Sequence, residues 1–263
     1  MVSWLSAQSA WVLTAIFVPV ALLVGFAARL VALAVIPPRE RDQARAIATA
    51  LMTAFAATFA LLIALTVSNE ATALSSAQNT VSAEAAQASV LAWTSTAPGV
   101  HSAPIQAALR SYLRATRANE WHNSAAASGS DPQTNQAIAA LERTVRTQVD
   151  DRDLSTSTSN ELLSSLDALS SGRRLRLAEA SRGLPDFYAV TVLVTGLALI
   201  VNISVVGIRS GLRPAAVGAS LTIVVGLSLA LIFALATPWL GSITVSGSPL
   251  DAVIHDLTTG YFR

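Results

Sequence analysis

Four stretches of the chain contain only uncharged, mostly apolar residues, and each is long enough to cross a lipid bilayer. A helix that crosses the hydrocarbon core needs roughly 20 residues at about 1.5 Å per residue. The stretches cover residues 10–28, 46–69, 187–208 and 214–239. The hydrophobic pattern therefore predicts an all-α integral membrane protein with four transmembrane helices.

Residues 70–186 are more polar, and their apolar residues recur at helical spacing instead of alternating. Breakers such as SGSDP and DRDLSTSTSNE separate the periodic runs, and Ser159 or Asn160 can cap a helix that begins near Glu161. The pattern predicts an extramembrane domain of packed helices between the second and third spans. The residues with helical spacing are Ile105, Leu109, Tyr112, Leu113 and Thr116, then Ile138, Leu141, Val145 and Val149, and then Leu162, Leu163, Leu166 and Leu169.

These patterns divide the chain into four segments. Residues 1–69 carry transmembrane helices 1 and 2, residues 70–186 form the helical domain, residues 187–241 carry transmembrane helices 3 and 4, and residues 242–263 form a short tail. The N-terminal MVSWLSAQSA has no basic region typical of a signal peptide, so we expect the first helix to be retained. In the tail, ITV is β-branched and PLDAVIHDL has the pattern of a brief helix. We expect the tail to fold back against the 70–186 domain.

Composition narrows the possible environment and partners. Of 263 residues, 52% are hydrophobic and 13% are charged, whereas about 25% of a soluble domain is charged. The net charge of +1 argues against a nucleic-acid partner, which would require a basic excess. The sequence contains no lysine, which is typical of a high-GC bacterial genome. We therefore expect a multi-pass protein of the bacterial plasma (inner) membrane, in contact with the lipid bilayer.

The arginines give opposing indications of orientation. The two short connections carry Arg39, Arg41 and Arg45 in one and Arg209 and Arg213 in the other, and arginine in short loops is retained in the cytoplasm. This places the 70–186 domain and both termini outside the cytoplasm. The arginines at residues 173–182 flank the third span and favour the opposite orientation. Two concordant short loops outweigh one flank of a long segment, so we predict an extracytoplasmic domain.

No set of residues forms a recognisable catalytic or metal site. The three histidines lack the spacing that presents two imidazoles on one face, and there is no cysteine. The acidic group Asp150, Asp151 and Asp153 lacks the glycine and the terminal glutamate of a calcium-binding loop. We therefore predict no cofactor and no enzymatic activity.

Three charged features have both a structural and a functional interpretation. Glu70 and Glu84 lie fourteen residues apart on one predicted helix face. They form a solvated stripe, pair with arginine of the 173–182 stretch, or form a charged ring in an oligomeric vestibule. Arg29 lies within an apolar stretch but near its end, where it can extend to the membrane interface. The stretch RRLRLAEASRGLP at 173–185 indicates an interfacial helix end whose arginines contact either lipid phosphates or the acidic residues Glu84 and Glu120.

Four blocks, in order and over nearly the whole chain, resemble the bestrophin-like membrane proteins of bacteria. They are Val81 with Glu84-Ala85 after the second span, SYLRATRANEW with Tyr112, Glu120 and Trp121, RRLRLAEASRGLP with Arg173, Arg176 and Pro185, and PWLGSITVSGSP with Pro238. The last block departs from the Asp-x-Pro-Phe-like pattern of the family, because Ala236 stands where the acidic residue would be. A charge-based role at that position is therefore lost.

The resemblance implies kinship with bestrophins, which are pentameric anion channels with an apolar neck lined by the second span. By this analogy the protein is a homo-oligomeric ion channel permeable to anions, with Phe55, Phe59 and Leu62 as candidates for the pore lining. The analogy also implies a cytoplasmic helical domain, contrary to the arginines of the short loops. The alternative is a non-conducting membrane subunit or sensor whose helical domain binds a protein partner.

Overall fold

A computed structural model describes residues 9–121, 129, 131–150, 154–181, 186–208, 212–236, 239 and 243–262. Within these ranges the regular secondary structure is helical, with no strand. The chain forms two compact units. Unit 1 consists of Met1–Thr72, Gly183–Thr237 and Gly241–Ile243, and unit 2 of Ala73–Arg182, Pro238–Leu240 and Thr244–Arg263.

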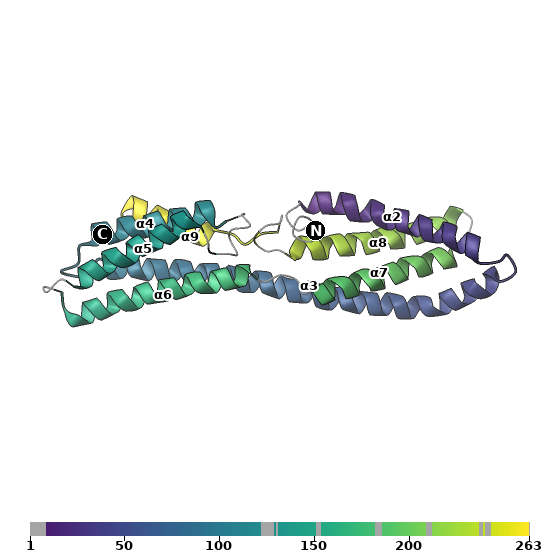
Figure 1. Cartoon of the computed structure of the whole chain (residues 1–263), viewed down its shortest axis with the longest axis horizontal. Coiled ribbons are helices and arrows are strands. Elements are labelled where there is room, and N and C mark those ends of the chain that lie inside the picture. The colour runs from purple at the N-terminus through teal and green to yellow at the C-terminus, as the bar shows by residue number, and fades with distance from the viewer. Residues whose placement is uncertain are drawn as a thin grey trace. The chain divides into compact units, whose positions relative to one another are not determined.

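Unit 1 contains the helices that can cross a membrane (Figure 1). These are α2 (Ala10–Val35), the first part of α3 (Arg41–Thr94), α7 (Asp186–Val206) and α8 (Leu212–Leu235). The prediction of four transmembrane helices is confirmed, since all four are long and apolar enough to span a bilayer. The chain is therefore a multi-pass membrane protein.

Helix α2 has a defined beginning and end. The hydroxyl of Ser9 accepts a hydrogen bond from the Val12 N–H at its start, as expected of an N-cap serine. At its end, the guanidinium of Arg41 donates to the carbonyl oxygens of Leu33 and Ile36, at 2.9 and 3.2 Å. These bonds satisfy carbonyls that the end of a helix leaves without a partner.

The core of unit 1 combines apolar side chains with close helix contacts. Its buried residues include Phe59 of α3, Leu199 of α7 and Val225 of α8. A Cβ atom added at Gly226 of α8 would lie only 3.0 Å from the Cα of Val18 in α2. Small residues at such contacts allow backbones to pack closely in lipid, where dispersion replaces the hydrophobic effect.

Among the described residues, unit 2 contains the rest of α3 and four further helices. These are α4 (Ser102–Asn119), α5 (Pro132–Val149), α6 (Thr156–Ala180) and α9 (Ser248–Thr259). Most of the predicted periodic residues are buried in its core, whereas Ile138 and Val149 pack partly buried against it and Leu163 is half-buried. Ile105, Leu109, Leu141 and Leu162 are among those completely buried, so the predicted packing of amphipathic helices is confirmed.

One predicted helix boundary is wrong. Helix α6 begins at Thr156, five residues before Glu161, and Ser155 is its N-cap. The Ser155 hydroxyl accepts a hydrogen bond from the Thr158 N–H at 3.1 Å. The segment STSTSN offers several potential cap residues and no breaker, so the sequence pattern alone selected a cap one turn too late.

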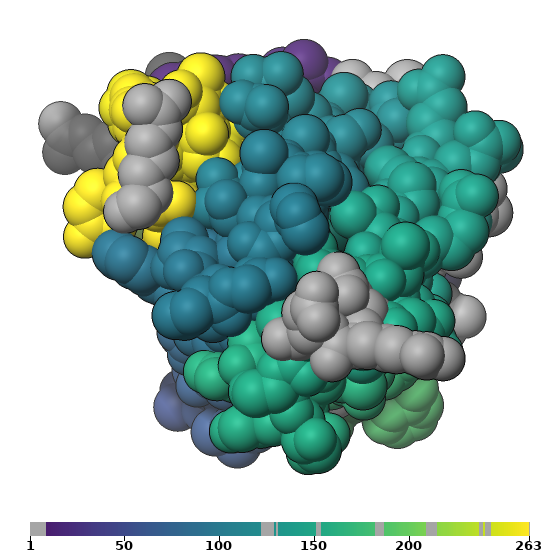
Figure 2. All heavy atoms as spheres, turned by 90° about the vertical axis from the view of Figure 1, so that its left-hand side faces the viewer, coloured from purple at the N-terminus to yellow at the C-terminus, as the bar shows by residue number. Residues whose placement is uncertain are grey.

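The C-terminal tail packs within unit 2, as its sequence indicates. Figure 2 shows α9 (yellow) beside α4 (blue), and α9 buries Leu250, Val253 and Leu257 in the core. Residues 244–247 form neither helix nor strand. The backbone N–H of Ser246 donates to Oε1 of Gln78 at 2.8 Å. This side-chain contact replaces the strand pairing for which ITV has a propensity.

Candidate functional site

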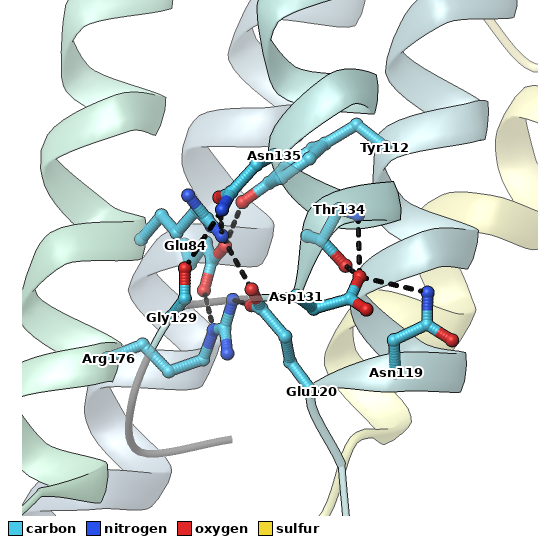
Figure 3. Close-up of polar contacts among 10 residues, drawn as sticks. Glu84, Tyr112, Asn119, Glu120, Gly129, Asp131, Thr134, Asn135 and Arg176 are labelled. Atoms are coloured by element: carbon cyan, nitrogen blue, oxygen red, sulfur yellow. Dashed lines mark hydrogen bonds and ion pairs between the residues drawn. The ribbon is translucent and has the colours of Figure 1, made fainter. Parts of the chain in front are cut away.

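Four ionisable side chains from three helices meet in the interior of unit 2. Glu84, Glu120 and Arg176 are labelled in Figure 3. Glu84 belongs to α3, Glu120 is the C-cap of α4, and Arg173 and Arg176 belong to α6. Arg176 donates through Nε to Glu84 at 2.6 Å and through Nη2 to Glu120 at 2.7 Å. Arg173 donates through Nη2 to the other oxygen of Glu120 at 2.5 Å. We call these four residues the buried charge cluster.

The buried charge cluster is electrically balanced and shielded from water. Glu84, Glu120 and Arg176 have completely buried side chains, and that of Arg173 is 11% exposed. Two carboxylates oppose two guanidinium groups, so the formal charge of the cluster is zero. Burying an isolated charge is unfavourable, and the arrangement avoids this because every carboxylate oxygen accepts a hydrogen bond.

Two neutral side chains complete the cluster. The phenol of Tyr112 in α4 donates to Oε1 of Glu84 at 2.6 Å, and Asn135 of α5 accepts from Arg173 at 2.8 Å. Burial, followed by the negative charge of Glu84, holds the pKa of Tyr112 well above its ordinary value. The phenol therefore remains protonated and acts as a hydrogen-bond donor at neutral pH.

The charge state of Arg176 results from two opposing effects. Burial disfavours the charged guanidinium, but the negative charges of Glu84 and Glu120 and the hydrogen bond to Glu84 outweigh burial and raise the pKa of Arg176. Arg176 is therefore a permanent cation. It links α3, α4 and α6 at one point.

Trp121 connects the buried charge cluster to the C-terminal segment. The guanidinium carbons of Arg117 and Arg176 lie 4.9 and 5.7 Å from the centre of its ring, within the range of cation–π attraction. Its Nε1 donates to the carbonyl oxygen of Val245 at 3.2 Å. The ring also packs edge-to-face against Trp239 at 5.2 Å.

The neighbouring start of α5 is held by a second polar group (Figure 3). Asp131 is the N-cap of α5 and accepts from the backbone N–H and the hydroxyl of Thr134, at 2.6 and 2.7 Å. The hydrogen bond from the Thr134 side chain is the main cause of the lowered pKa of Asp131. Asn119 donates to the same carboxylate at 3.1 Å, which attaches α4 to the start of α5.

The structure thus brings together six of the residues identified from the sequence blocks. Each of the six contacts at least one other member of the set, which consists of Glu84, Tyr112, Glu120, Trp121, Arg173 and Arg176. Of the two interpretations of the 173–185 stretch, Arg173 and Arg176 follow the one with acidic partners. The complete burial of Glu84 excludes it from a vestibule ring.

The other candidate residues lie elsewhere. Pro185 and Pro238 fall outside the described residues. In unit 1, Phe59 is 6% exposed in the helical core and Leu62 packs partly buried against that core, whereas Phe55 is 37% exposed. The candidates for a pore lining therefore do not share one environment in the single chain.

Sequence reasoning missed two contributors, Asn135 and Arg117. Asn135 lies in a polar segment without a motif, and only its position one turn into α5 brings it to Arg173. Arg117 binds Asp251 of α9 through two hydrogen bonds of 2.7 and 2.9 Å. No sequence signal links residues separated by 134 positions.

The contacts of the buried charge cluster indicate a structural role, because they hold α3, α4 and α6 together. Its carboxylates are engaged by permanent cations and a phenol, and no cysteine is present in the sequence. Among the described residues, no group of three or more histidine or acidic side chains is arranged to hold a metal ion. The arrangement fixes helices and offers no free base or nucleophile.

Four membrane-spanning helices and a helical unit with a buried charge cluster define an all-helical membrane protein. The sequence matches the model of the Bestrophin-like domain over residues 20–250. The chain therefore belongs to the bestrophin-like family.

One solved crystal structure of a membrane protein has the same fold. It aligns with a TM-score of 0.66 at 14% identity, over 94% of this chain and 96% of that chain. None of the curated proteins matches the sequence.

Proposed function

We propose that the protein is a homo-oligomeric, anion-permeable channel of a bacterial plasma membrane, and not an enzyme. Membership of the bestrophin-like family supports this function, because bestrophins are oligomeric anion channels. The buried charge cluster supports a structural and not a catalytic role for unit 2. An oligomeric channel needs a helix surface that its own subunit leaves exposed, for contact with other subunits or for lining the pore. Helix α3 provides such a surface.

The observation that carries the proposal is an uncovered stripe on α3 in unit 1. Ile47, Leu61 and Leu65 are 54%, 61% and 53% exposed, and their helical spacing places them on one face. Three exposed alanines lie between them on the same face. We call Ile47, Ala50, Ala54, Ala57, Leu61 and Leu65 the outer stripe of α3.

The outer stripe of α3 has three alanines in succession at its centre. Helix α2 also exposes Ala27 and Ala34, but these alternate with larger exposed residues. Helix α2 exposes bulky residues such as Leu23, Phe26 and Val31, which suit contact with acyl chains. Small residues, by contrast, permit another helix to approach closely in lipid. A second copy of the chain is the partner that a homo-oligomer supplies, so the stripe favours subunit contact.

The pore lining is assigned to the exposed side of α3. Residues 46–69 contain no charged side chain, and a hydrophobic constriction can gate a pore by dewetting. Phe55 is exposed beside the outer stripe, whereas Phe59 and Leu62 pack against the subunit's own core. Phe55 is therefore the candidate for the constriction.

Recordings from purified protein in planar lipid bilayers test this function. We expect a conductance whose reversal potential follows the chloride gradient. Phe55→Ser should increase the current because a polar side chain favours water in the constriction. Leu23→Ala is the matched control, since Leu23 is exposed on α2, and should leave the current unchanged. A monomeric particle without conductance under any anion gradient would refute the channel and favour a non-conducting subunit.

The orientation is tested separately. Arginines in the two short connections favour unit 2 outside the cytoplasm, as the sequence predicts. The native chain has no cysteine, so Ser130→Cys introduces a unique thiol into the 70–186 segment and Glu40→Cys one into a short connection. We expect a membrane-impermeant reagent applied to intact cells to label the first variant and not the second. The reverse pattern would place unit 2 in the cytoplasm.

A further inference from the structure

A cavity of about 230 Å³ lies within unit 1, among α2, α7 and α8. Its lining includes Phe26 and Arg29 of α2, Ile203 and Ser204 of α7, and Gly218 and Thr222 of α8. These residues lie near the C-terminal ends of α2 and α7 and the N-terminal end of α8 (Figure 1). The cavity is thus at the membrane end that carries the two short connections.

Arg29 is the polar group in this lining without an internal partner. It is half-buried, and it makes no hydrogen bond or ion pair within the part of the chain that the structure describes. The hydroxyls of the lining are already engaged: Ser204 donates to the carbonyl oxygen of Gly25 at 2.9 Å, and Thr222 to that of Gly218 at 3.0 Å. The donors left for a ligand are therefore those of a guanidinium.

The depth of Arg29 agrees with a ligand at the membrane interface. Arg29 lies six positions before the end of α2 at Val35, which is about 9 Å along a helix. A long arginine side chain can cover much of this distance and place its charge at the headgroup level. Thr222, ten residues into α8, lies about 15 Å from the start of that helix. The cavity therefore extends from the interface toward the acyl-chain region.

Several residues that line this space are small, among them Gly25, Gly218 and Ala219. The Cβ of an alanine at Gly25 would lie 3.4 Å from Cγ2 of Ile200, and one at Gly218 would lie 3.3 Å from Cγ2 of Ile203. The first distance is an ordinary van der Waals contact, and the second is slightly closer. No carboxylate is among the lining residues that would neutralise Arg29.

We infer that this cavity binds an anionic membrane phospholipid, with Arg29 pairing with the phosphate of the headgroup. The guanidinium supplies several donors that match phosphate oxygens, and Phe26 and Ile203 provide an apolar wall for the adjoining part of an acyl chain. The arginines of the short connections add positive charge at the same membrane end, which attracts anionic lipids. The apolar wall and the volume favour a lipid over a free phosphate ion.

The test measures lipid binding to the delipidated, full-length protein in a neutral detergent. Native mass spectrometry would quantify retained phosphatidylglycerol, with phosphatidylcholine and inorganic phosphate as parallel probes. We expect phosphatidylglycerol to bind most tightly and Arg29→Gln to weaken it about tenfold to a hundredfold, as expected for loss of a charge-assisted contact. Arg39→Gln removes an exposed arginine from the neighbouring connection and should change the affinity less than about threefold.

A second variant tests the cavity independently of the charge. Ala219→Leu places a larger side chain in the lining and should also weaken phosphatidylglycerol binding, with Arg29 intact. Equal losses in Arg29→Gln and Arg39→Gln would show nonspecific surface attraction and overturn the proposal. Equal binding of inorganic phosphate would assign the site to a free anion, and unchanged binding in Ala219→Leu would place the lipid elsewhere. None of these results depends on whether the protein conducts ions.

Discussion

Among single residues, Arg176 connects the two carboxylates of the buried charge cluster. It donates to Glu84 and to Glu120, and all three side chains are completely buried. Removing one partner of a buried pair leaves an uncompensated charge, which is more unfavourable than the pair was favourable. The stability of unit 2 therefore depends more on the completeness of the cluster than on any one of its hydrogen bonds.

Replacement of Arg176 by methionine should lower the free energy of unfolding by about 3–5 kcal/mol. Denaturant titration in detergent, followed by tryptophan fluorescence, measures this change. Arg174→Met is the matched control, because Arg174 lies on the exposed side of the same helix and bonds to Ser171. The control should differ from wild type by less than about 0.5 kcal/mol. Similar losses in the two variants would show that the cluster contributes little.

Because of Tyr112, we expect the stability of unit 2 to depend on pH in the alkaline range. The pKa of its phenol is raised well above its ordinary value by burial and by Glu84. The unfolded chain then releases this proton at a lower pH than the folded chain, so the stabilising contribution is complete below about pH 10 and declines above it. We expect the denaturant concentration at the midpoint of unfolding to decrease as the pH rises above 10.

Tyr112→Phe separates the hydrogen bond from the ionisation. At pH 7 the variant should lose about 1.5–3 kcal/mol, since a hydrogen bond to a charged group is removed. Above pH 10 its stability should decline less steeply than that of wild type, because the ionisable phenol is absent. Tyr261→Phe is the control, since Tyr261 is 63% exposed. A parallel alkaline decline in wild type and Tyr112→Phe would assign the effect to another group.

At the level of elements, the sequence predicted helices and core positions better than it predicted environments within the membrane. Most of the periodic residues of unit 2 are buried because one face of each helix contacts water and the other does not. In unit 1 no such contrast exists, since lipid and protein interior are both apolar. Phe55 and Phe59 thus look alike in sequence, although one is exposed and the other buried.

The candidate site was predictable in composition but not in geometry. The sequence blocks named six residues that the structure brings together, and acidic partners for the arginines were among the stated alternatives. Which arginine donates to which oxygen depends on how α3, α4 and α6 cross, and no local pattern encodes this. The start of α6 was missed for a different reason, because Ser155 and Ser159 are chemically equivalent as caps.

The contact between α2 and α8 depends on Gly226. An added Cβ would lie 3.0 Å from the Cα of Val18 and 3.2 Å from the carbonyl oxygen of Phe17, and backbone atoms cannot rotate away. Gly226→Ala should therefore destabilise unit 1 by about 1–3 kcal/mol. Gly25→Ala should have a smaller effect, because its nearest contact is a side-chain atom at 3.4 Å. Thermal unfolding in detergent compares the two, and a larger loss in Gly25→Ala would contradict this account.

For the molecule as a whole, the outer stripe of α3 predicts a specific assembly. Ala57→Trp places a bulky ring beside the alanines at the centre of the outer stripe and should prevent close helix contact between subunits. Light scattering coupled to size-exclusion chromatography should show several subunits per particle for wild type and fewer for the variant. Leu23→Trp on α2 is the control and should leave the mass unchanged. Dissociation by Leu23→Trp instead would assign the subunit contact to α2.

The buried charge cluster also limits the order in which the protein can mature during synthesis. Glu84 precedes Arg176 by 92 residues and Glu120 precedes it by 56. Before α6 is synthesised, the carboxylates of Glu84 and Glu120 lack the arginines that bind them in the folded protein. The interior between α3 and α4 is therefore incomplete at that stage. We therefore expect the segments made first to stay hydrated and accessible to a chaperone or protease until α6 has been synthesised.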